Sequence, residues 1–91
     1  MNAEWDEISF VISSRYRTAT LKRLSEGPAT PSQIATDVEM GIAHVSRALQ
    51  ELREESLVDL LVSDDRKKGR VYGITDGGEA VWSTIETENL A

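Results

Sequence analysis

The chain has 91 residues, enough for one domain spanning residues 1–91 but not for two. It contains no cysteine, which excludes disulfides, thiolate nucleophiles and cysteine-based zinc sites, and fits a reducing compartment. The first residues are acidic, and no apolar run approaches the ~18 residues that span a bilayer. We therefore expect a cytoplasmic protein that is neither exported nor bound to a membrane.

The formal net charge is −6, from 16 acidic and 10 basic residues, which is opposite in sign to that of a typical nucleic-acid-binding domain. The basic residues are confined to three short stretches, at 15–23, 47–53 and 66–70. Each stretch alone is read as a solvated face, but together they would form a basic surface if the fold brings them to one side. The acid excess and the scarcity of lysine suggest a halophilic protein from a high-salt cytoplasm; an ordinary acidic mesophilic protein is the alternative.

Two short helices are predicted at the start of the chain. The first, at about 3–12, has on its apolar face Trp5, Ile8 and either Val11 or Ile12. The second is capped by Ser13 or Ser14 and continues to about residue 26, where Gly27-Pro28 ends it. Its inner face is expected at Tyr16, Ala19, Thr20 and Leu24. One long helix bent at the serines is the alternative.

The clearest helix start is a capping box at Thr30-Pro31-Ser32-Gln33, with a Thr cap, Pro at the first helical position and Gln three residues after the cap. It predicts a short helix to about residue 37, with an inward face at Ile34, Ala35 and Val38. A turn at 39–41 follows. The next predicted helix, at about 42–55, has an inward face at Ile42, Val45, Leu49 and Leu52.

The outward face of the 42–55 helix carries the candidate recognition residues. A helical projection turns Ala43, Ser46, Arg47 and Gln50 outward, with His44 on the flank. Small residues permit close approach, and Arg and Gln are the types that bind guanine and adenine edges in a major groove. An ordinary amphipathic helix is the alternative.

The rest of the chain predicts a β-hairpin and a final helix. The strands are expected at 57–62 and 70–74, joined by a charged loop whose Gly69 can adopt a positive φ. Thr75 is expected to cap a helix over about 76–89, with an apolar face at Ala80 or Val81, Trp82 and Ile85.

The residues offer no catalytic centre. His44 is the only histidine, and Ser46, two residues on, cannot form a triad with it on a helix. Gly77-Gly78 opens a helix without the pattern of a nucleotide-binding loop. We therefore expect no enzyme, no metal site and no cofactor.

Five segments carry a family resemblance: TPSQIA (30–35), MGI (40–42), HVSRALQEL (44–52), SLV (56–58) and GRVYGITDGG (69–78). From about Trp5 to Ile85 the chain resembles winged-helix regulators of the MarR-like and ArsR-like superfamily, particularly small archaeal members. The resemblance implies an α+β, mostly α, winged helix-turn-helix fold with a helical N-terminus, a two-stranded wing and a C-terminal helix. It also implies a sequence-specific transcriptional regulator that binds double-stranded DNA.

The implied DNA-binding residues fall into three groups. The recognition helix would contribute Ala43, His44, Ser46, Arg47 and Gln50 in the major groove. The wing would contribute Arg66, Lys67, Lys68 and Arg70 on the backbone or in the minor groove. Ser32 and Gln33 would approach phosphate. Metal-sensing relatives use Cys and His ligands, but this sequence has one His and no Cys, so metal sensing is not implied. Gly41 occupies the position where a Ser or Thr cap is common, so the cap of the recognition helix is expected to be weaker.

Two alternatives to a DNA-binding regulator are a protein-interaction module that never touches DNA and a sensor that binds a small molecule between the terminal helices and the core. We further expect a homodimer joined through the terminal helices. Its candidate surface is Trp5, Ile8, Val11 or Ile12, Val81, Trp82 and Ile85. The alternative is that both Trp rings only close the core of the monomer.

Overall fold

The computed structural model describes residues 3–62 and 69–90, and its element order is the one predicted. The helices are α1 (Ala3–Ile12), α2 (Arg15–Ser25), α3 (Pro31–Val38), α4 (Ile42–Glu54) and α5 (Asp76–Thr87). The strands are β1 (Val58–Val62) and β2 (Val71–Ile74). Within the described ranges, none of the helices combines the length and apolar character needed to cross a membrane.

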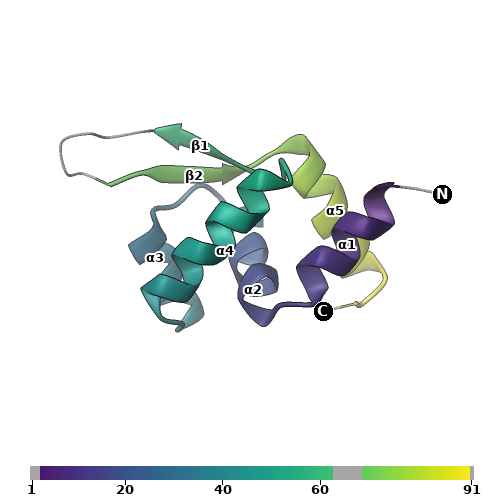
Figure 1. Cartoon of the computed structure of the whole chain (residues 1–91), viewed down its shortest axis with the longest axis horizontal. Coiled ribbons are helices and arrows are strands. Elements are labelled where there is room, and N and C mark those ends of the chain that lie inside the picture. The colour runs from purple at the N-terminus through teal and green to yellow at the C-terminus, as the bar shows by residue number, and fades with distance from the viewer. Residues whose placement is uncertain (1–2, 63–68, 91) are drawn as a thin grey trace.

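The helices pack around a common core, with α1 and α5 together at one end and the hairpin projecting from the other (Figure 1). The α1 and α2 helices are separate, because Ser14 is an N-cap with extended backbone whose hydroxyl accepts a hydrogen bond from the Arg17 amide at 3.2 Å. The alternative of one bent helix is thereby excluded.

The core is built from apolar side chains on every helix and from the hairpin. Of the alternatives left open, Val11 rather than Ile12 and Val81 rather than Ala80 are buried. Leu21 is fully buried on α2 although the expected inner face omitted it, whereas Tyr16 is only partly buried. Thr20 is also fully buried, and its hydroxyl has no hydrogen-bond partner among the described atoms.

The apolar face of α4 differs from prediction at its first residue. Val45, Leu49 and Leu52 are buried as expected, and Ala48 is buried beside them. Ile42 was wrongly placed in the core and is 54% exposed. It is the first residue of the helix, where the chain has only just left the turn, and the buried stripe begins one turn later.

The α3 helix begins as its sequence predicts. The Thr30 hydroxyl accepts a hydrogen bond from the Gln33 amide at 3.1 Å, and the Thr30 amide donates to the Gln33 side-chain oxygen at 2.9 Å. This reciprocal pair satisfies two amides that a helix N-terminus would otherwise leave unpaired. Glu39, in the left-handed region at φ 59°, ends the helix and turns the chain into α4.

The hairpin is antiparallel, with Val58 opposite Ile74 and Leu60 opposite Tyr72, and an irregularity in register before Val62. Gly69, at the described end of the connecting loop, has the predicted positive φ, 88°. The segment between α2 and α3 joins β2 from the other side, because Ala29 and Tyr72 exchange two backbone hydrogen bonds at 3.0 and 2.9 Å. The base of the hairpin is therefore attached to the helical body.

The start of α5 lies against the segment that leads into β1. The Thr75 hydroxyl accepts a hydrogen bond from the Gly78 amide at 2.9 Å and donates one to the Ser56 carbonyl at 2.8 Å. A Cβ added to Gly78 would lie 2.1 Å from the Leu57 carbonyl oxygen, whereas one added to Gly77 would meet nothing closer than 3.7 Å. Gly78 is thus needed for this close backbone approach.

This contact predicts opposite effects for two neighbouring glycines. Gly78→Ala should lower the free energy of unfolding by about 1 to 3 kcal/mol, because the backbone must move to accept the methyl group. Gly77→Ala should be neutral or stabilising by up to about 1 kcal/mol, since alanine favours the helix. Urea denaturation of both variants checks this, and equal stabilities would contradict the packing described for Gly78.

Candidate nucleic-acid interface

The α4 helix presents its predicted recognition residues to solvent. The buried stripe of α4 packs against α2, so the opposite side of the helix faces outward. The predicted residues Ala43, His44, Ser46, Arg47 and Gln50 are all exposed, and so are Arg53 and Glu54 toward the end of the helix. Gly41 is the N-cap of the helix and makes no side-chain hydrogen bond, as expected, so the first turn is closed by the Val45 amide, which donates to the Gly41 carbonyl at 3.1 Å.

Arg47 is a cation of this face, and its side chain is 81% exposed. Its Nε lies 3.3 Å from Oε2 of Glu51, one turn along the same helix. An exposed pair of this kind contributes only about 0.3 to 0.5 kcal/mol, so it orients Arg47 without holding it firmly.

Arg17, in contrast, is a structural residue. Its guanidinium donates to the Phe10 carbonyl at 2.7 Å, to the Ser13 hydroxyl at 2.9 Å and to Oε1 of Glu51 at 2.9 Å. It also lies 4.1 Å from the centre of the Phe10 ring. These contacts connect the end of α1, the start of α2 and the middle of α4. The hydrogen bond from Arg17 is the main reason that the pKa of Glu51 lies below its ordinary value.

Arg23 also makes hydrogen bonds within the fold. Its Nε donates to Asp37 on α3 at 2.7 Å, and its terminal nitrogen donates to the Gly27 carbonyl at 3.1 Å. The basic stretch at 15–23 therefore does not contribute all of its charge to one outer surface. Arg17 and Arg23 neutralise carboxylates within the fold, whereas Arg15 and Lys22 remain exposed.

A hollow of about 430 Å³ lies between α4 and the base of the wing, and we call it the wing-side hollow. Its lining comprises Pro31, Ser46, Leu49, Gln50, Arg53, Arg70 and Tyr72. Arg70 therefore lies beside two of the predicted recognition residues, Ser46 and Gln50. Arg53 was missed by the sequence reasoning, although its spacing of seven residues from Ser46 would have placed it on the same side of the helix.

A second hollow lies on the other flank of α4 and is called here the α2-side hollow. It is lined by Ser14, Tyr16, Arg17, His44, Arg47, Ala48 and Glu51. Here the Tyr16 and His44 rings stack with centroids 4.3 Å apart and planes 5° from parallel. The Arg15 guanidinium also lies over the Tyr16 ring, 5.1 Å from the ring centroid, and donates a hydrogen bond to the Tyr16 hydroxyl at 3.4 Å. Tyr16 was expected in the core, and no sequence signal indicated this stack.

The remaining candidate residues lie at the start of α3 and in the wing. Ser32 and Gln33 are exposed there, but the Gln33 side-chain oxygen is used by the capping box. Arg66, Lys67 and Lys68 lie outside the described residues.

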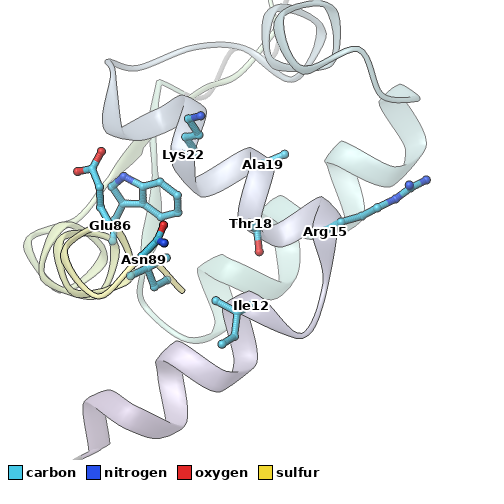
Figure 2. A pocket seen from close by; sticks show the side chains of 9 residues that line it. Ile12, Arg15, Thr18, Ala19, Lys22, Glu86 and Asn89 are labelled. Carbon is cyan, nitrogen blue, oxygen red and sulfur yellow. The ribbon is translucent and has the colours of Figure 1, made fainter. Parts of the chain in front are cut away.

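A third hollow, of about 550 Å³, lies between α2 and the terminal helices (Figure 2). Its lining is mixed, with Ile12, Ala19 and Trp82 beside the charged or polar Lys22, Glu86 and Asn89. Figure 2 shows Lys22 and Glu86 on one side of it, with Arg15 pointing away from them. This is the location considered for a small-molecule ligand.

The family model for the HVO_A0261 N-terminal domain matches residues 5–89. The chain belongs to this family. The comparison with curated proteins found no match. Among solved structures, the reduced form of the transcriptional regulator YodB from B. subtilis superposes with a TM-score of 0.80 at 18% identity, covering 99% of this chain and 89% of that one.

Two further structures are similar over most of this chain. ZitR of Lactococcus lactis has a TM-score of 0.75 at 22% identity, covering 85% of this chain and 53% of its own. A MarR family transcriptional regulator from Silicibacter pomeroyi has a TM-score of 0.72 at 26% identity, covering 84% and 52%. The chain thus spans about half the length of these two proteins. The likeness confirms the winged-helix fold.

The Arg17 contact predicts a specific pH dependence of stability. Because the pKa of Glu51 is lowered in the folded state, the stability from this carboxylate is present above its unfolded pKa and is lost as pH falls through its folded pKa. Glu51→Gln should therefore lower stability at pH 7, and the difference from wild type should shrink in acid.

Urea denaturation at pH 7 and at about pH 3 measures this difference. Glu54→Gln, an exposed carboxylate outside the ion pairs of the described residues, is the matched control and should change stability little. A constant difference between Glu51→Gln and wild type at both pH values would contradict the prediction.

Proposed function

We propose that this protein is a sequence-specific transcriptional regulator that binds double-stranded DNA as one domain, with α4 in the major groove. The observation that carries the proposal is the outer side of α4, where Ala43, Ser46, Arg47 and Gln50 are exposed together. Arg53 and Arg70 adjoin them in the wing-side hollow. Within the described residues, neither arginine belongs to an ion pair, so both have charge available for phosphates.

The fold supports the same proposal. A winged helix offers one helix to the major groove and a hairpin to the adjacent backbone or minor groove. The structures that resemble this chain include transcription regulators by name. The wing cations Arg66, Lys67 and Lys68 belong to the proposed surface on sequence grounds, beside the exposed Arg70.

Selection from randomised duplex DNA tests the function directly. Duplexes retained by the protein would be sequenced after several rounds, in dilute and in molar KCl, since a halophilic protein should keep its preference at high salt. A DNA-binding regulator should enrich one motif. Flat enrichment at both salt concentrations would favour the protein-interaction module.

Arg47 and Arg70 should affect DNA binding in different ways. Arg47→Ala should cost about 1 to 3 kcal/mol on the selected duplex and relax the preference at one base position, because a base contact is lost. Arg70→Ala should weaken binding to the selected and a scrambled duplex about equally, because a phosphate contact carries no sequence information. Fluorescence anisotropy measures both. Equal, sequence-independent losses from the two variants would contradict the assignment.

We also propose a homodimer through the terminal helices, on a smaller surface than the sequence suggested. Ile8, Val11, Val81, Trp82 and Ile85 are buried in the monomer and are unavailable. The large apolar side chains that the described terminal segments leave exposed are Trp5 at 51%, Ile12 at 38% and Leu90 at 37%. Two recognition helices about one DNA turn, ~34 to 36 Å, apart would read two half-sites.

Dimerisation predicts that charge at this surface separates the chains. The double variant Trp5→Glu, Ile12→Glu should shift the mass from two chains to one, because the new carboxylates cannot be desolvated without partners. Leu61→Glu, an equally exposed apolar residue on the hairpin, is the control and should keep the wild-type mass. Light scattering at micromolar concentration, in dilute and in concentrated salt, measures the mass. If the wild-type protein has the mass of a single chain at both salt concentrations, the dimer proposal is wrong.

A further inference from the structure

The ion pairs divide the arginines of the described chain into two classes. Arg17, Arg23 and Arg47 contact carboxylates, and the first two are largely enclosed by the fold. Arg15, Arg53 and Arg70 are exposed and belong to no ion pair within residues 3–62 and 69–90. The formal net charge of the chain is −6, but these three arginines have no carboxylate partner among the described residues, so their charge is available to an anionic ligand.

These three arginines lie on both flanks of α4. Arg53 and Arg70 line the wing-side hollow with Gln50. On the opposite flank, Arg15 is joined to α4 through Tyr16, whose ring stacks on His44 in the first turn of that helix. Arg70 thus lies on one flank of α4, and Arg15 provides a cation on the α2-side flank.

The stack explains how Arg15 is kept at this place. Its guanidinium lies over the Tyr16 ring and donates to the Tyr16 hydroxyl, while the ring itself is held against the His44 imidazole. A guanidinium fixed over an aromatic ring keeps its charge and its outward hydrogen-bond donors, and loses less conformational freedom when it binds an anion. Arg15 is one of the residues that line the hollow between α2 and the terminal helices, and its side chain extends away from Lys22 and Glu86 (Figure 2).

We propose that Arg15, positioned by Tyr16 and His44, binds a DNA backbone phosphate on the side of the recognition helix opposite the wing. A helix in the major groove, which is about 12 Å wide, has a phosphate backbone along each of its flanks. Arg53 and Arg70 face one backbone, and the Arg15–Tyr16–His44 stack faces the other. This inference rests on the proposed function, and it adds a contact outside the helix-turn-helix and the wing.

The matched control for Arg15 is Lys22. It is a cation on the same helix, exposed and without an ion pair in the described part of the chain, but it lies two turns away beside Glu86 and Trp82. Arg15→Gln and Lys22→Gln remove the same charge, so a general effect of net charge would appear in both. A phosphate contact would appear only in the first.

The test is fluorescence anisotropy on the selected and a scrambled duplex over a series of KCl concentrations. Arg15→Gln should raise Kd several-fold on both duplexes and reduce the slope of log K against log salt by about 1. Tyr16→Leu should produce the same loss, whereas Tyr16→Phe, which keeps the ring but loses the 3.4 Å hydrogen bond to Arg15, should lose less. Lys22→Gln should change neither quantity. Circular dichroism unfolding establishes that each variant is folded.

Neutral methylphosphonate substitutions, introduced at one phosphate at a time, locate the contact. At one phosphate, the neutral substitution should weaken DNA binding by the wild type but not by Arg15→Gln. This phosphate should differ from those at which the substitution no longer weakens binding by Arg70→Ala. The inference is overturned if wild type binds DNA and Arg15→Gln matches it, or if Arg15→Gln and Lys22→Gln have equal effects. A wild type that binds no duplex at all would overturn the proposed function itself, and this inference with it.

Discussion

The packing of α4 against α2 is the constraint on which the proposed recognition surface depends. Val45, Ala48, Leu49 and Leu52 are all at most 1% exposed, and each large apolar side chain of this kind contributes roughly 1.5 to 3 kcal/mol when fully buried. Rotating α4 about its axis would expose this stripe, so the rotation is fixed by the core. Arg47 faces outward because its helix has no other stable orientation.

The acidic composition is reconciled with an anionic ligand by where the carboxylates lie. Glu51 and Asp37 each pair with an arginine from α2, so they stabilise contacts between helices and present less negative charge outside. Of the α4 carboxylates, Glu51 beside Arg47 is thus paired, whereas the exposed Glu54 lies at the C-terminal end of the helix. Net charge describes solubility and long-range approach, whereas the local pairing of charges decides which surface accepts a phosphate.

Local signals made most of the fold predictable from the sequence. The capping box at Thr30, the Thr75 cap and the positive φ of Gly69 depend on residues within a few positions of each other, and all were predicted correctly. The errors concern long-range contacts. Helical periodicity could not show that Ile42 lies before the buried stripe, nor that Leu21 faces the core, because both depend on how neighbouring helices pack.

In the candidate site, too, the features that depend on local sequence were predictable and the long-range contacts were not. The outward residues of α4 followed from its period of 3.6 residues. The Tyr16–His44 stack joins residues 28 positions apart on different helices, and nothing local distinguishes Tyr16 from a core aromatic residue. Likewise, the two classes of arginine look alike in sequence, since a partner such as Glu51 lies 34 residues from Arg17.

The strength of each ion pair determines which arginines are available to a ligand. Arg17 makes three hydrogen bonds and a ring contact with a side chain only 16% exposed. Removing it would leave the Phe10 carbonyl with only the Ser13 hydroxyl as a side-chain donor and Glu51 with only the exposed contact to Arg47. Arg47 shares Glu51 through one exposed contact of 3.3 Å, which a phosphate or a base edge can replace at little cost. Because Arg17 keeps its own hydrogen bond to Oε1, Glu51 is still paired after Arg47 leaves. Arg47 can thus leave Glu51 without loss of the Arg17 contacts that join α1, α2 and α4.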